Sequence, residues 1–262
     1  MITVATYNIL HGYYAKTILD DLKLMIDKEV DVFCLQEADI PFEQPLHTLL
    51  VGEHFKNWQV DYAHEGSGVN LALLWNTSRL QVAGFHTTIF PALSKPDILQ
   101  RLKRVKETLH RGALSGYFLV DGKIIRITSV HLAWEGGIKH RLAQLAQLKT
   151  ELAEQPADYD VIGGDFNTMA PSSLRRFQQK KVEAALGPEY VDVLPHLHWS
   201  ADQSYIAPQD HWETVVKVLK FLHLKWRARL DYLFARNLKV VAAEMIDLPG
   251  SDHRPLVAKL RF

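Results

Sequence analysis

The sequence predicts an α+β protein in which two mixed or antiparallel sheets pack face to face, with helices on the outside. Short apolar, β-branched runs that are typical of strands recur from end to end of the 262 residues. Helical periodicity occurs in fewer places, between some of these runs. No repeat, low-complexity linker or change in composition marks a boundary. We therefore expect a single domain over residues 1–262.

The predicted strands follow one another along the whole chain. They cover residues 2–9, 30–37, 69–75, 80–90, 112–120, 123–132, 160–166, 229–235, 238–246 and 255–262. Asp121-Gly122 separates two of them, and this dipeptide supplies the positive φ angles of a tight hairpin. We therefore expect those two strands to be antiparallel. Asn237 indicates a further turn between later strands.

Two segments have the apolar spacing of amphipathic helices. Residues 16–29 place one apolar face at Ile18, Leu19, Leu22, Met25 and Ile26. Residues 138–154 repeat the pattern, and Pro156 ends that helix. Residues 95–110 and 211–229, both basic, are interpreted as additions around the strand framework.

The overall composition is that of a globular chain without extreme charge. Thirty basic and thirty acidic residues give a formal net charge of zero. This balance argues against a generic nucleic-acid coat, although a local basic groove stays open. Cys34 is the only cysteine, so no disulfide forms within the chain. The first residues lack the basic region of a signal peptide, and no apolar run approaches the ~20 residues of a membrane span. We expect a cytoplasmic protein.

Polar residues recur where the predicted strands end. The set comprises Asn8, Glu37, His131, Asp165, Asn167, Asp231, Asp252 and His253. Taken singly, each has an ordinary explanation as a turn residue, a solvated strand end or a hydrogen-bonded core histidine. Loops at strand ends are the usual place for sites on a rigid scaffold. So many coincidences in one chain favour one shared site.

The chemistry of this set is rich in oxygen donors. Oxygen ligands suit a hard cation such as Mg²⁺ or Mn²⁺. Zinc is disfavoured, because the sequence has no HExxH motif and no cysteine pair. The sequence also has no GxSxG elbow and no Walker loop. A hard metal with acids and histidines fits hydrolysis of a phosphate ester, in which a carboxylate or histidine handles the water proton.

Six segments occur in order between Thr6 and Leu256, namely TYNIL, LQE, SVHL, GGDFN, RLDYLF and SDHRPL. With these segments, and with RGAL and GVNLALLW, the chain resembles the endonuclease/exonuclease/phosphatase superfamily. Its members include deoxyribonuclease-I-like nucleases, abasic-site endonucleases, neutral sphingomyelinases and inositol-polyphosphate 5-phosphatases. The resemblance implies a four-layer α/β/β/α sandwich and Mg²⁺-dependent cleavage of a phosphoester, with Mn²⁺ as an alternative cation.

The resemblance also implies roles for the metal-binding and water-orienting residues of the site. Glu37 matches the direct metal ligand of the family. Asn8 and Asp252 match groups that complete or support the metal site, partly through water. Asp165 matches the acid that orients or deprotonates the attacking water. Asn167 matches an amide that holds the phosphate or that acid.

The remaining residues match the phosphate-binding half. His253 matches the histidine that contacts the phosphate, as base or charge stabiliser, and Asp231 the carboxylate that orients it. His131 matches a further phosphate contact, with Asn70 as its polar neighbour. Abasic-site endonucleases tend to carry tyrosine in place of His131, and secreted deoxyribonucleases a glutamate near Asn70. These differences argue against a DNA-repair or secreted nuclease.

We therefore predict a Mg²⁺-dependent hydrolase that cleaves a phosphodiester by attack of water oriented by Asp165. A small phosphodiester, a lipid headgroup and a nucleic acid stay open as substrates. Residues 211–229 are compatible with a helix at a membrane surface, a cationic wall for the substrate or an ordinary packed helix. The alternatives are a nuclease on DNA or RNA and a non-catalytic binding module. The intact acids and histidines oppose the last, and no obligate protein partner is indicated.

Overall fold

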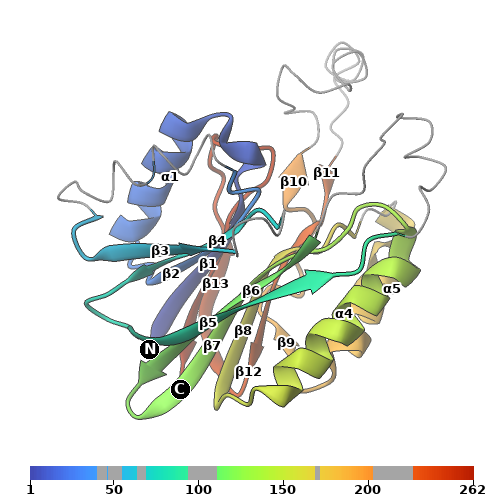
Figure 1. Cartoon of the computed structure of the whole chain (residues 1–262). Coiled ribbons are helices and arrows are strands. Elements are labelled where there is room, and N and C mark those ends of the chain that lie inside the picture. The colour runs from blue at the N-terminus through green and yellow to red at the C-terminus, as the bar shows by residue number, and fades with distance from the viewer. Residues whose placement is uncertain (40–45, 47–54, 64–68, 94–110, 169–171, 203–226) are drawn as a thin grey trace.

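The structure is a computed structural model that describes residues 1–39, 46, 55–63, 69–93, 111–168, 172–202 and 227–262 (Figure 1). Their strands form two six-stranded sheets. The first sheet has the order β13 (Lys239–Met245), β14 (Leu256–Arg261), β1 (Ile2–Asn8), β2 (Val32–Gln36), β4 (Leu71–Asn76) and β3 (Trp58–Tyr62). The second has the order β5 (Gln81–Phe90), β6 (Arg111–Val120), β7 (Lys123–His131), β8 (Tyr159–Asp165), β12 (Asp231–Arg236) and β9 (Val191–Asp192).

Both sheets are mixed and largely antiparallel, as predicted. The only parallel pairs within the two sheets are β1 with β2 and β7 with β8. The hairpin between β6 and β7 turns at Asp121 and Gly122, whose φ angles are 50° and 76°. These positive angles confirm the tight antiparallel turn predicted from the Asp-Gly dipeptide.

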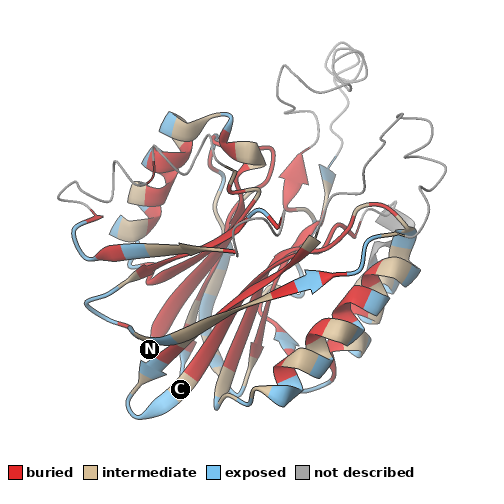
Figure 2. Cartoon of the chain, viewed as in Figure 1, coloured by how far each residue is buried: buried red, intermediate tan, exposed pale blue. Residues whose placement is uncertain are grey.

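The hydrophobic core consists of three clusters, one between the two sheets and one between each sheet and the helices that cover its outer face. This arrangement is the predicted four-layer α/β/β/α sandwich. Inward side chains of both sheets, such as Val4, Leu73 and Ile127, pack against one another between the sheets. Helix α1 (Ala15–Asp27) covers the outer face of the first sheet. Helices α4 (Gly137–Glu154) and α5 (Ser172–Leu186) cover the second sheet. Figure 2 shows the buried residues concentrated in the strands and on the inner faces of the helices.

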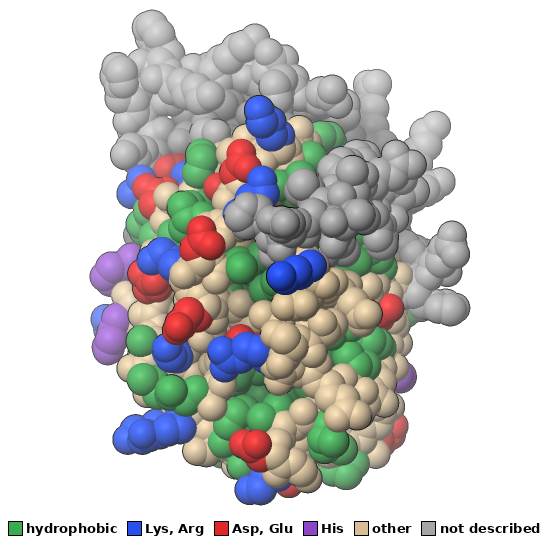
Figure 3. Space-filling model, turned by 90° about the vertical axis from the view of Figure 1, so that its left-hand side faces the viewer, with side chains coloured by type: hydrophobic (Ala, Val, Ile, Leu, Met, Phe, Trp, Pro, Cys, Tyr) green, Lys and Arg blue, Asp and Glu red, His purple; other side chains and the backbone are tan. Residues whose placement is uncertain are grey.

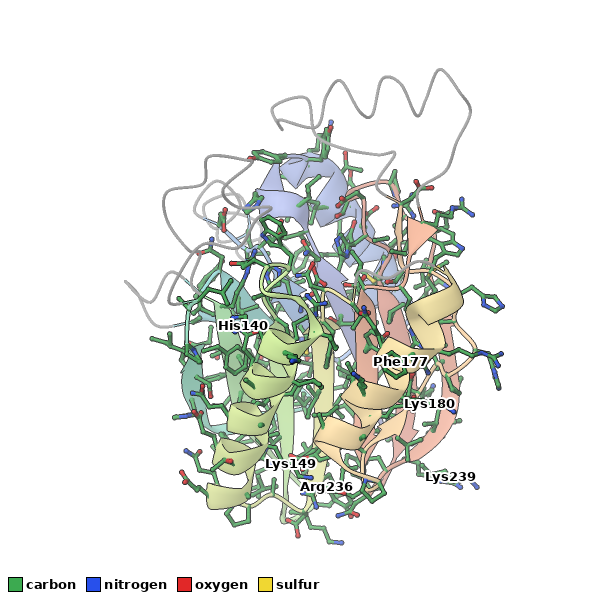
Figure 4. The ribbon with its side chains drawn as sticks, turned by 90° about the vertical axis from the view of Figure 1, so that its right-hand side faces the viewer. His140, Lys149, Phe177, Lys180, Arg236 and Lys239 are labelled. Atoms are coloured by element: carbon green, nitrogen blue, oxygen red, sulfur yellow. The ribbon has the colours of Figure 1, made fainter. Side chains whose placement is uncertain are left out.

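Helix α5 and strand β3 were not predicted from the sequence. In α5 most of the sequence SSLRRFQQKKVEAAL is polar, and the helix lies beside α4 (Figure 4). Its buried Val182 and Leu186 supply the contact with the core, whereas Phe177 is exposed. Strand β3 lies at a sheet edge, where half-exposed side chains weaken the apolar pattern. Tertiary packing therefore stabilises both elements more than their local sequence does.

A two-stranded ribbon of β10 (Ala201–Asp202) and β11 (Arg227–Ala228) adjoins the loop that precedes β14 of the first sheet. Asp202 N donates to Asp252 O at 2.8 Å, and Arg254 N donates to Ser200 O at 2.7 Å. Residues 95–110 and most of 211–229, which the sequence analysis singled out, lie outside the described residues. Within the described residues, no helix has the length and hydropathy needed to cross a membrane.

Candidate active site

The polar residues predicted to form a site meet at one end of the sandwich. The parallel pairs bring the last residues of neighbouring strands together, Asn8 beside Gln36 and His131 beside Asp165. Asp231 begins β12 and is paired with Asp165, because these strands are antiparallel. The loop that carries His253 precedes β14, which is antiparallel to β1. All of these strand ends therefore face the same edge of the fold.

Asp165 is held at the centre of this group. Asn8 Nδ2 donates to Asp165 Oδ2 at 3.1 Å, and the backbone N–H of Asn167 donates to Oδ1 at 2.8 Å. The carboxylate is almost fully buried. Gly164 permits this position, because a Cβ there would lie 1.9 Å from the carbonyl oxygen of Val130 in β7. The Asp165 carboxylate therefore has a fixed orientation between the two sheets.

Asp231 and His253 form a buried pair on one side of Asp165. His253 Nδ1 lies 2.8 Å from Asp231 Oδ2, which places a proton on Nδ1. His253 Nε2 lies 3.9 Å from Asp165 Oδ2. The backbone N–H of His253 also donates to Ser251 Oγ at 3.1 Å. The pair therefore directs Nε2 toward the same space that Asp165 faces.

His131 approaches Asp165 from another side. Its Nε2 lies 3.5 Å from Asp165 Oδ2 and 3.9 Å from Glu37 Oε1. Arg111 Nη1 lies 3.2 Å from His131 Nδ1. A guanidinium group only donates, so Nδ1 accepts and the ring hydrogen sits on Nε2. Burial, followed by the positive charge of Arg111, holds the pKa of His131 well below its usual value. His131 is therefore a neutral donor toward the carboxylates.

The tautomer of His131 is directly testable. We expect ¹⁵N–¹H correlation spectra of the metal-free protein near neutral pH to show a protonated Nε2 and an unprotonated Nδ1. Arg111→Met should remove this preference, because methionine fills similar space without a donor. A wild-type spectrum with the hydrogen on Nδ1 would contradict the assignment.

Burial and mutual proximity disfavour the ionised forms of the carboxyl groups in the site. Burial raises the pKa of Asp165 to about 7, with the charge of His253 acting against this rise and that of Asp231 adding to it. Burial likewise raises the pKa of Asp252 to about 6. Burial opposes a charge on His253, but the carboxylates of Asp231 and Asp252 outweigh it and hold the pKa of His253 well above its usual value. When its carboxyl groups are all ionised, the site therefore carries more negative charge than the nearby histidines neutralise.

The same pKa shifts predict how a divalent cation affects stability. Asp165, Asp252 and His253 all bind protons more tightly in the folded than in the unfolded state, so their contribution to metal-free stability falls as pH rises from about 4 to about 8. A bound cation favours the ionised carboxylates. We therefore expect Mg²⁺ to raise the melting temperature more at about pH 8 than at about pH 5.5. Thermal scans with Mg²⁺ or EDTA measure this. An equal rise at both pH values would contradict the prediction.

The donors present fit a hard divalent cation. Ligand atoms of Asp165, Asp231 and His253 all lie within 4.8 Å of one another. Asp231 Oδ1 is buried without a hydrogen-bond partner among the described residues. Carboxylate oxygens dominate the set, which suits Mg²⁺ or Mn²⁺ better than a softer metal. This geometric group differs from the ligand set inferred from the sequence, which was Glu37, Asn8 and Asp252, and His253 can ligate a metal only after Nε2 loses its proton.

The ligand set inferred from the sequence lies next to the geometric group of Asp165, Asp231 and His253. Glu37 is half-buried beside His131, and its charge contributes to the raised pKa of Asp252. Asn8 is engaged at both ends, because its Oδ1 accepts from Leu10 N at 3.0 Å while its Nδ2 reaches Asp165. Asn8 therefore supports Asp165, and a direct contact of Asn8 with a metal stays a prediction, like those of Glu37 and Asp252.

The predicted substrate contacts lie at the same end of the fold. Asn70 is exposed, and its carbonyl oxygen accepts from Ala38 N at 3.1 Å, next to Glu37. Asn167 has a φ of 49° and donates through Nδ2 to Leu132 O at 2.9 Å. Its backbone, rather than its side-chain amide, contacts Asp165. Substrate contacts of Asn70, Asn167 and His131 stay predictions.

Sequence reasoning missed four residues that the structure adds to this region. They are His11, Gln36, Asp39 and Arg111. Gln36 Nε2 donates to Ser129 Oγ at 2.9 Å and so joins the two sheets directly below the site. Asp39 lies only two residues after Glu37, and this closeness in sequence is the one signal that it offered. Arg111 begins the RGAL segment, but that segment gave it no role, because its contact with His131 exists only in the folded chain.

The sandwich and its cluster of acids and histidines define a phosphoesterase fold. The chain belongs to the Endonuclease/Exonuclease/phosphatase family, whose model matches residues 5–253. A search of curated proteins found no match.

Solved structures of similar fold cover the whole chain. TDP2 from D. rerio, complexed with a single-strand DNA product, has a TM-score of 0.73 at 16% identity and covers 100% of this chain and 99% of its own. The endonuclease/exonuclease/phosphatase from Bacteroides vulgatus has a TM-score of 0.70 at 17% identity, with 99% and 98% covered. A mannosyl-6-phosphatase of Bacteroides thetaiotaomicron VPI-5482 has a TM-score of 0.68 at 15% identity, with 100% of both chains covered. At these identities the likeness shows the fold alone.

Proposed function

We propose that the protein is a Mg²⁺-dependent hydrolase that cleaves a phosphodiester. One observation carries this proposal: the Asp165 carboxylate is fixed by two hydrogen bonds and faces the Nε2 atoms of His131 and His253. A buried carboxylate with a pKa near neutrality is suited to accept a proton from water. Two Nε2–H donors beside it are suited to bind phosphoryl oxygens.

In the proposed reaction, Asp165 orients a water molecule and accepts its proton as the water oxygen bonds to phosphorus. The bond from phosphorus to the leaving oxygen breaks, and that oxygen takes a proton from solvent. His253, charged and held by Asp231, donates through Nε2 to a phosphoryl oxygen. His131 donates as a neutral imidazole. Glu37 and Asp252, supported by Asn8, would hold the cation, which neutralises charge on the phosphoryl oxygens when bound.

A small phosphodiester is the substrate class that we favour. The net charge is zero, and Figure 3 shows acidic and basic side chains interspersed over one face of the molecule. A long nucleic acid would favour a continuous cationic surface. A nuclease activity is the second candidate, supported by the TDP2 structure with its single-strand DNA product. A phosphomonoester is the third, supported by the mannosyl-6-phosphatase structure.

The test is hydrolysis of bis-p-nitrophenyl phosphate with Mg²⁺, Mn²⁺ or EDTA. We expect turnover with either cation and none with EDTA. Turnover that persists in EDTA would refute the metal requirement. A panel of single-stranded DNA, RNA, sphingomyelin, inositol phosphates and mannose 6-phosphate then identifies the substrate class. Hydrolysis of only the monoesters in this panel would overturn the assignment to phosphodiesters.

A further inference from the structure

His11 and Asp39 lie beside Glu37 and have no part in the reaction proposed above. His11 belongs to the short 3-10 helix η1 (Leu10–Gly12), which follows β1, and Asp39 follows β2. These strands are parallel neighbours, and Ile9 N donates to Gln36 O at 3.0 Å where they end. The strand pairing therefore brings His11 next to the segment that carries Glu37 and Asp39.

The imidazole of His11 bridges two carboxylates. Its Nδ1 lies 2.5 Å from Asp39 Oδ2, and its Nε2 lies 3.2 Å from Glu37 Oε2. The Nδ1 contact is a hydrogen bond with Asp39, and the Nε2 contact is an ion pair with Glu37 when the ring is protonated. This contact engages Oε2 of Glu37. The other oxygen, Oε1, is the one that lies 3.9 Å from His131 Nε2, on the side of Asp165.

The backbone on both sides of this contact has an uncommon conformation. The φ angle is 53° at His11 and 57° at Glu37. Residues other than glycine rarely adopt such angles, and they do so where surrounding structure imposes them, often at functional sites. Leu10, next to His11, shares this conformation with a φ of 49°, and His11 and Glu37 are the two of these residues that contact each other. The fold thus holds the His11 ring and the Glu37 carboxylate face to face.

We propose that His11, held by Asp39, is a positioning residue that ties Oε2 of Glu37 and so presents Oε1 to the metal. This inference rests on the proposed function, because it takes Glu37 as a metal ligand. The arrangement parallels the opposite side of the site, where Asp231 holds His253. Hydrogen bonds that fix the orientation of a ligating carboxylate strengthen metal binding. His11 and Asp39 should therefore control metal affinity as one unit.

Calorimetric titration with Mn²⁺ tests this without any substrate. His11→Asn is the informative variant, because asparagine tolerates the left-handed backbone and its side chain is too short to bridge both carboxylates. We expect it to weaken Mn²⁺ binding by roughly 10- to 100-fold. Asp39→Asn should also weaken binding, and the double variant should be no weaker than His11→Asn alone. The control is His86→Asn in β5, whose ring contacts Glu151, and it should bind like the wild type.

The outcomes separate this inference from the proposed function. Loss of binding in Glu37→Gln together with wild-type affinity in His11→Asn would overturn the inference and leave the function standing. A wild-type protein that binds no Mn²⁺ would overturn both. Melting temperatures in EDTA show whether each variant folds. If His11→Asn does not fold, Asp39→Asn decides, and wild-type affinity in that variant overturns the inference.

Discussion

Replacing Asp165 by asparagine is expected to lower the turnover number by roughly 10²- to 10⁴-fold, the range typical of a lost general base. Asparagine has nearly the same shape but only one acceptor oxygen, so it keeps the contact with the Asn167 backbone N–H and loses the one with Asn8 Nδ2. It cannot accept the water proton. Initial rates on bis-p-nitrophenyl phosphate at saturating Mg²⁺ measure the effect.

The same variant should fold well. The raised pKa of Asp165 means that its ionised form destabilises the metal-free protein near pH 8. Removing this charge offsets the hydrogen bond that asparagine loses, so Asp165→Asn should melt in EDTA close to the wild-type temperature at that pH. Loss of turnover without loss of stability distinguishes a reacting group from a structural one. The matched control is Asp20→Asn, an exposed position of α1, which should leave both quantities unchanged. A turnover number close to that of wild type would remove Asp165 from the mechanism.

Replacing Asp160 by alanine is expected to have the largest effect on folding, lowering the free energy of unfolding by roughly 3–5 kcal/mol. Asp160 is the second residue of β8, at the end away from the site, and is almost fully buried. Arg126 Nε donates to its Oδ1 at 2.7 Å, and Tyr190 Oη donates to its Oδ2 at 3.1 Å. Arg236 also forms an ion pair with it. Alanine would leave the buried guanidinium of Arg126 without its carboxylate.

Urea unfolding followed by circular dichroism measures this loss. Asp20→Ala serves as the control, because its exposed pair with Lys23 should contribute less than about 1 kcal/mol. The part of the Asp160→Ala protein that remains folded should keep its Mn²⁺ affinity, since Asp160 and Asp165 lie at opposite ends and on opposite faces of β8. A change below about 1 kcal/mol would show that the buried pair does not stabilise the fold.

The strand framework was predictable because its signal is local. Runs such as VNLALLW and KIIRITSVHL have the β-branched, apolar character of buried strands, and the structure has a strand in each. The two predicted helices at residues 16–29 and 138–154 also occur, within a residue or two of their predicted ends. Helix α5 was not predicted, because its contacts with the core come from only a few apolar side chains.

The candidate site was only partly predictable, because its residues are defined by contacts between distant segments. Glu37 and Asp165 end apolar strands, which made them visible in the sequence. His11 follows Asn8 in a short turn and gave no such signal. Arg111 begins a strand and looks like an ordinary surface cation until β6 and β7 pair.

The sequence by itself determined which polar residues stand at the ends of strands and are candidates for the chemistry. Residue type and period-two spacing carry that information over a few positions. Only the tertiary structure decided which atoms meet, such as Asn8 Nδ2 with Asp165 Oδ2 across 157 positions of sequence, and the His11 ring between two carboxylates. Hydrogen bonds depend on distances of a few tenths of an ångström, and only the packed sheets fix positions to that degree.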